Sequence, residues 1–153
     1  MPSFETRIRV RSYELDGLGH VNHAVYLNYL EQARYDAMEA GGFPHTAVLG
    51  RGWGIYVVRI EVDYRRQCFQ GDHLRILTGV EHFRKVSMTI GQQIHRSGEG
   101  ETDGEPAVTA RVTLVWIDER GRPMRVPPEA RRALGEPDGS LSAPARPIQK
   151  ESR

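Results

Sequence analysis

The sequence predicts an α+β fold in which one long helix lies across a largely antiparallel sheet. Three observations lead to this prediction. Alternating apolar and polar residues recur in five segments, which is typical of strands that bury one face. One further segment repeats its apolar residues every three or four positions, as an amphipathic helix does. The later strands follow one another through short connections, which favours antiparallel pairing.

The first strand is expected over Phe4–Val10, where apolar positions alternate with charged ones. Turn-forming residues follow, and the period then changes to that of a helix over about Ala24–Ala40. Asn22 is a candidate cap, because its side chain can accept a hydrogen bond from the first free amides of the helix. Gly41-Gly42 and then Pro44 are expected to end the helix.

The remainder of the chain is dominated by strand patterns. A flexible stretch is expected over His45–Gly54, and a polar loop over Ser97–Pro106. A short helix is expected to start at Pro127-Pro128, since proline is tolerated in a first helical turn. The strands are expected over residues 58–65, 74–81, 86–94 and 108–116. The pattern indicates one domain over residues 1–135 and a flexible tail over 136–153, where Pro, Gly, Ser and charged residues dominate.

Composition excludes several classes of protein. The 153 residues fit one domain, and 39% hydrophobic with 27% charged residues are globular values. A net charge of +1 gives no indication of a nucleic-acid partner or an anionic membrane. Cys68 is the single cysteine, so no disulfide forms within the chain. No apolar run reaches the roughly 20 residues of a membrane helix, and no secretory signal pattern is present. A cytoplasmic location is therefore expected.

The densest group of chemically useful side chains precedes the long helix and comprises Asp16, His20, Asn22 and His23. The first amides of a helix have no intrahelical partner, so they can stabilise the negative oxygen that develops on an attacked carbonyl. An aspartate is ionised at neutral pH and can activate water or attack the carbonyl itself. The group therefore suits hydrolysis of an activated acyl compound. The same residues also make an ordinary turn and helix cap, and the residues alone leave both interpretations open.

The stretch Tyr13–Arg34 resembles the signature of the 4-hydroxybenzoyl-CoA thioesterase-like family of hotdog proteins. It reads as Asp16, two residues, then Gly-His-Val-Asn, followed by a tyrosine and a helix with Glu and Ala-Arg. The segment Tyr64–Asp72 is similar to the exit of the family's second strand and its Gly-Asp turn. The resemblance extends over about Glu5–Glu119 and implies a hotdog fold.

This resemblance implies an acyl-CoA thioesterase that needs no metal or other cofactor. Asp16 corresponds to the catalytic carboxylate, acting as nucleophile or general base. Amides near His23 and Ala24 would polarise the thioester carbonyl. Three further residues would line the site and position the substrate, namely His20, Asn22 and Tyr26.

The resemblance also implies partners. The active site is expected between two subunits, so the chain should form a homodimer, often paired again into a homotetramer. Arg84 and Lys85 are candidates for contacts with the phosphates of acyl-CoA. No nucleic-acid or membrane partner is expected.

Several alternatives accompany this interpretation. Many relatives carry Asn where this sequence has His23, which adds a second imidazole to the site. Some hotdog branches use a helical Glu as the carboxylate, for which Glu31 and Glu39 are the candidates. Cys68 is a candidate nucleophile with no evident His partner, and a strand-end thiol is the simpler interpretation. The competing functions are a hotdog hydratase or dehydratase and a non-catalytic acyl-CoA-binding protein.

Overall fold

The computed structural model describes residues 4–97 and 104–135. The expected tail over 136–153 and most of the expected loop over 97–106 lie outside the described residues. The described residues contain five strands, three α-helices and a short 3-10 helix, in the order β1 Phe4–Arg9, η1 Ser12–Glu14, α1 Val25–Ala40, α2 His45–Gly50, β2 Gly54–Tyr64, β3 His73–Phe83, β4 Ser87–Ser97, β5 Val108–Ile117 and α3 Pro128–Ala133.

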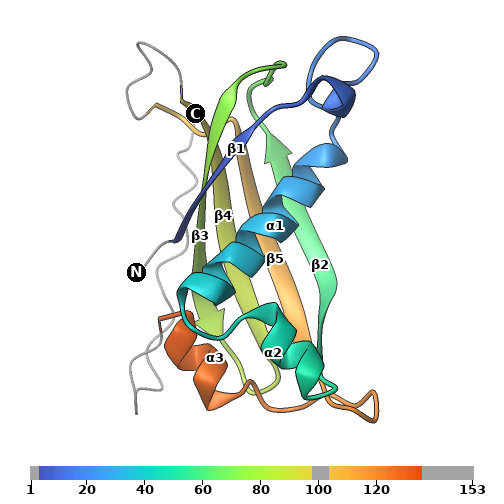
Figure 1. Ribbon diagram of the computed structural model, residues 1–153, viewed down its shortest axis with the longest axis vertical. Coiled ribbons are helices and arrows are strands. Elements are labelled where there is room, and N and C mark those ends of the chain that lie inside the picture. Colours follow the sequence, from blue (N-terminus) through green and yellow to red (C-terminus); the bar gives the residue numbers. More distant parts are fainter. Residues whose placement is uncertain (1–3, 98–103, 136–153) are drawn as a thin grey trace.

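The strands form one antiparallel sheet in the order β1-β3-β4-β5-β2. Helix α1 crosses one face of this sheet, while α2 and α3 lie at one end of it (Figure 1). The predicted α+β architecture, with a long helix against an antiparallel sheet, is confirmed. The other face of the sheet carries no helix among the described residues (Figure 1).

The core lies between α1 and the sheet. Leu30 and Ala33 of α1 are fully buried, and Ile94 and Val112 are fully buried on β4 and β5. A buried Leu, Ile or Val side chain is worth about 1.5–3 kcal/mol when it is removed from water. The strand alternation predicted from the sequence is therefore the alternation between a face covered by α1 and an outer face.

The prediction of a flexible stretch over His45–Gly54 is wrong. Pro44 precedes a six-residue helix, α2, whose Val48 is fully buried, and β2 already begins at Gly54. The helix is too short to show a clear period, and its stability comes from burying Val48 rather than from its sequence preference.

The two ends of the sheet differ in what they carry. One end contains the start of α1, the last residue of β2, Tyr64, and the first residue of β5, Val108. The opposite end contains the start of β2 and the turn between β3 and β4 (Figure 1). We call these the α1-start end and the far end. No helix among the described residues is long and apolar enough to cross a membrane.

Candidate active site

Asp16 lies in a tight turn just before α1. The Oδ1 atom of Asp16 accepts hydrogen bonds from the amides of Leu18 at 2.8 Å and His20 at 3.2 Å. The backbone closes the same turn, because the Asp16 amide donates to the His20 carbonyl at 2.7 Å. Gly19 takes a φ of +80°, a conformation that side-chain-bearing residues rarely adopt. The turn therefore fixes the carboxylate, and its Oδ2 atom has no hydrogen-bond donor among the described residues.

The surroundings of Asp16 keep it charged. The amide of Leu18 is the largest influence that holds the pKa of Asp16 below its usual value of 3.8, with further help from the amide and ring of His20 and the ring of His23. Partial desolvation of the carboxylate acts on this pKa in the opposite direction. An acceptor stabilised in this way is ionised throughout the neutral range.

The start of α1 differs in detail from the prediction. The helix begins at Val25 and its N-cap is Ala24, so Asn22 is not the formal cap. The Asn22 side chain instead accepts from the Ala24 amide at 2.9 Å, and the Asn22 carbonyl accepts from Val25 at 2.9 Å. The Ala24 amide is thus already engaged, whereas the His23 amide has no acceptor within the described part of the chain. Of the two predicted oxyanion donors, His23 is the one that this structure leaves available.

The predicted histidines lie on the same loop as Asp16 and have different surroundings. The ring of His20 is half-buried and meets the ring of Phe69 edge-on, with centroids 5.2 Å apart. His23 is exposed, and its carbonyl accepts a 2.8 Å hydrogen bond from the Tyr64 hydroxyl. This bond fastens the start of α1 to the end of β2.

Tyr26 lies in the core at the start of α1 and is 3% exposed. Its ring packs against Tyr29 and Tyr64, and burial raises its pKa. The side chain also interacts with Cys68, which is itself fully buried. In a single chain, these contacts give Tyr26 a packing role beneath the site.

Arg84 and Lys85 lie in the turn between β3 and β4, at the far end of the sheet. The eleven residues of β3 separate this turn from the α1-start end, a length of roughly 35 Å at about 3.3 Å per residue. The two side chains are exposed. Within one chain they are therefore remote from Asp16.

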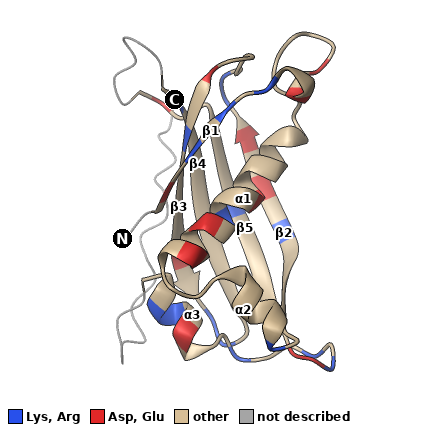
Figure 2. Ribbon diagram, viewed as in Figure 1, with Lys and Arg blue, Asp and Glu red and all other residues tan. Residues whose placement is uncertain are grey.

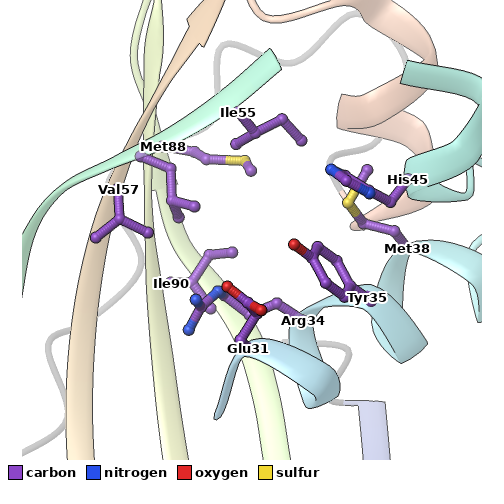
Figure 3. A pocket seen from close by; sticks show the side chains of 10 residues that line it. Glu31, Arg34, Tyr35, Met38, His45, Ile55, Val57, Met88 and Ile90 are labelled. Carbon is purple, nitrogen blue, oxygen red and sulfur yellow. The ribbon is translucent and has the colours of Figure 1, made fainter. Parts of the chain in front are cut away.

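A pocket opens between α1 and the sheet and encloses about 420 Å³, including the space at its mouth. Its helical wall carries polar and aromatic side chains, and its sheet wall is aliphatic (Figure 3). Asp16 and the other site residues that the family signature predicts do not line it, whereas Glu31, the alternative helical carboxylate, does. The lining residues are Glu31, Arg34, Tyr35, Met38, His45, Ile55, Val57, Met88, Ile90 and Leu114.

The sequence does contain a signal for this pocket. Arg34 lies on the same helical face as Leu30 and Met38, and Gln92 occupies the inward phase of β4 between Ile90 and Ile94. Polar residues in two facing apolar patterns indicate a buried polar contact.

The chain is similar to known proteins in both sequence and structure. Residues 10–134 match the model of the thioesterase-like superfamily. The chain belongs to this superfamily. Among curated proteins, the long-chain acyl-CoA thioesterase FadM of Escherichia coli is 33% identical over 74% of this chain and 83% of that protein. The chloroplastic acyl-acyl carrier protein thioesterase ATL2 of Arabidopsis thaliana is 30% identical over 86% of this chain and 68% of that protein.

Solved structures agree with the sequence comparison. A thioesterase of Thermus thermophilus, complexed with coenzyme A and Zn, has a TM-score of 0.71 and 31% identity. The match covers 85% of this chain and 90% of that one. The hotdog fold expected from the signature over Tyr13–Arg34 is confirmed by these matches.

Proposed function

We propose that the protein is an acyl-CoA thioesterase that hydrolyses the thioester to a free acid and coenzyme A. One observation carries the proposal: in a chain of the thioesterase-like superfamily, the turn before α1 holds an ionised Asp16 with one oxygen free of donors among the described residues. The name of the Escherichia coli relative, a long-chain acyl-CoA thioesterase, supports the same substrate class.

Two routes are open to Asp16. In the first, its free oxygen attacks the thioester carbonyl carbon, the thiolate of coenzyme A leaves, and water then hydrolyses the resulting anhydride. In the second, the carboxylate takes a proton from water, the hydroxide attacks the carbonyl, and the thiolate of coenzyme A leaves and takes up that proton. Both routes place a negative charge on the carbonyl oxygen. The His23 amide at the start of α1 is the proposed donor to that oxygen.

The edge of the sheet supports the proposed homodimer. Among the described strands, β2 has a neighbour on one side only, and apolar side chains near its middle are exposed, Val57 by 48%, Val58 by 60% and Ile60 by 37%. A long apolar edge strand invites pairing with another strand. Basic and acidic positions also occur together along this strand (Figure 2), so a second copy meets no block of like charge. A dimer joined along β2 covers this edge.

Such a dimer would complete the site. Antiparallel pairing of β2 with a second β2 sets the strand end at Tyr64 beside the start of the partner's strand. Because Tyr64 is hydrogen-bonded to His23, the start of α1 also lies beside the start of the partner's strand. Asp16 of the partner subunit then lies near Ile55 and Val57, at the mouth of the pocket. The pocket would hold the acyl group, with the carboxylate supplied from across the interface.

The same dimer suggests how Arg84 and Lys85 could contact coenzyme A. It brings the far end of one subunit, which carries Arg84 and Lys85, toward the α1-start end of the other. Contacts between these residues and the phosphates of coenzyme A are thus proposed across the interface. A homotetramer would need a second surface.

We place the enzyme in the cytoplasm, since a single cysteine suits a reducing compartment.

The direct test is release of free thiol from a panel of acyl-CoA esters with short, long and aromatic acyl groups. Thiol release that is proportional to enzyme and absent after heat inactivation is expected for at least one class. Binding of acyl-CoA without thiol release from any member of the panel would instead support the non-catalytic binding protein. A hydratase would convert enoyl-CoA esters with the thioester intact.

The lowered pKa of Asp16 predicts the pH dependence of the reaction. A carboxylate with a pKa below 3.8 keeps its charge as the pH falls, so kcat/KM should show no acid limb between roughly pH 5 and pH 8. Initial rates across this range, with circular dichroism at each pH to exclude unfolding, check the prediction. An acid limb near pH 6 in folded protein would mean that another group must be deprotonated.

A further inference from the structure

Arg34 is a buried cation in the wall of the acyl pocket. The residue is 8% exposed and lies on the helical wall, with its guanidinium directed into the space between α1 and the sheet (Figure 3). The opposite wall is aliphatic, with Ile90 and Leu114 among its members. Burial lowers the pKa of Arg34, but a guanidinium stays charged at neutral pH.

The position of this guanidinium is fixed by Gln92. The Gln92 side-chain oxygen accepts from Arg34 Nη1 at 3.0 Å. The Gln92 amide group donates to the Leu30 carbonyl and to the Thr78 hydroxyl, both at 3.0 Å. Because both donors of the amide are used, its oxygen must point toward Arg34. Gln92 is 1% exposed, so this network lies in the interior.

The charge of Arg34 is only partly compensated. A guanidinium offers five N–H donors, and Gln92 accepts one of them. No ion pair joins Arg34 to a carboxylate among the described residues, although the charge of Glu31, on the same wall of the pocket, acts on the pKa of Arg34 against the effect of burial. A buried cation whose hydrogen-bond partner is a single neutral amide is costly, and the cost grows if an apolar ligand displaces the remaining water.

We propose that Arg34 selects acyl groups that carry an oxygen acceptor, a hydroxyl or a carboxylate, in addition to the thioester oxygen. The aliphatic wall would cover the carbon skeleton of such a group, and the guanidinium would donate to its oxygen. An unsubstituted acyl group of the same length leaves the donors of Arg34 unpaired. Sites built to bind a polar group discriminate strongly against analogues that lack it.

This inference rests on the proposed function for its substrate, so its test does not require hydrolysis. Matched pairs of coenzyme A thioethers, which contain no thioester bond, are titrated calorimetrically into the full-length protein. Each pair carries a phenyl ring or a medium-length alkyl chain, with and without a terminal hydroxyl or carboxylate. The wild type should bind the oxygen-bearing member of at least one pair roughly 10- to 100-fold more tightly. Equal affinity within every pair overturns the inference, whether or not thiol release is found.

Variants assign the preference to Arg34. Arg34→Met keeps the length of the side chain and removes the charge, and should reduce the preference to about one. Arg34→Lys keeps the charge without the planar pair of donors, and should reduce the preference at least severalfold. Arg7→Met makes the same kind of substitution at an exposed arginine of β1, outside the pocket, and should leave the preference unchanged.

These variants also separate selection from a structural role. If Arg34 served only to pack the core, its replacement would weaken both members of a pair equally and leave their ratio intact. That result contradicts the inference. Should Arg34→Met fail to fold, the wild-type ratios and Arg34→Lys decide the question.

Discussion

Replacing Asp16 by Asn should lower kcat for acyl-CoA hydrolysis by roughly 10²–10⁴-fold, the usual contribution of a positioned base. The amide keeps an oxygen that can accept from Leu18 and His20, so the turn should persist. What is lost is the negative charge that attacks the carbonyl or takes the proton from water. The KM for acyl-CoA should change little, because the pocket between α1 and the sheet is untouched.

The chain contains a closely matched control at Asp118. Its Oδ1 accepts from the amides of Arg120 at 2.9 Å and Arg122 at 3.0 Å, and its own amide donates to the Arg122 carbonyl. These amides hold the pKa of Asp118 below its usual value, as in the turn of Asp16. Asp118, however, follows β5 at the far end of the sheet and precedes no long helix among the described residues.

Asp118→Asn therefore removes the same kind of carboxylate from the same kind of turn. We expect near wild-type kcat for this variant and a thermal unfolding temperature close to that of Asp16→Asn. Full activity in Asp16→Asn would refute the assignment of the carboxylate while leaving the thioesterase activity open. Equal loss in both variants would point to a general effect of the turns on stability.

The pair Asp16 and Asp118 also shows what the sequence can and cannot predict. The turn around each is readable from the spacing of Asp and Gly, since these residues favour such a conformation. The turn alone does not distinguish a catalytic carboxylate from a structural one. The proposal that Asp16 is the catalytic one rests on its register with a long helix, which both the family signature and the periodicity of α1 convey.

Strands that bury one face were predictable, and the edge of the sheet was less so. β5 alternates strictly because Val112 and Leu114 face α1 while their neighbours face outward. Near the start of β2, the run Ile55–Val58 shows no alternation, because the register with β5 shifts between Val57 and Arg59 and the edge strand is only partly covered. The pocket depends on how α1 sits over β4, and no local pattern specifies that distance.

The second large effect is expected at the edge strand. Val58→Asp together with Ile60→Asp places carboxylates in the middle of β2, where two copies would face each other across the proposed two-fold axis. Both positions are exposed in the single chain, so the subunit fold should survive. Like charges at close range oppose pairing. The variant should be monomeric by light scattering, and its activity should fall at least about 100-fold, as expected when a catalytic group is misplaced.

The matched control is Val58→Thr with Ile60→Thr, which is polar and β-branched and adds no charge. It should remain dimeric and active. A folded monomer of the Asp variant with full activity would show that one chain contains the whole site. That outcome would remove the partner from the mechanism while leaving Asp16 in place.

Mixed dimers test directly whether Asp16 of one subunit acts in the pocket of the other. Asp16→Asn subunits lack the carboxylate, and Ile90→Trp subunits carry a bulky ring in the wall of the pocket. If the carboxylate acts on the partner's pocket, a dimer with one subunit of each kind contains one intact site. That site combines Asp16 of the Ile90→Trp subunit with the unaltered pocket of the Asp16→Asn subunit. Mixing two inactive variants should then restore up to about half of the specific activity per mixed dimer. A site made within one chain would instead leave each subunit with its own defect, and mixing would restore nothing.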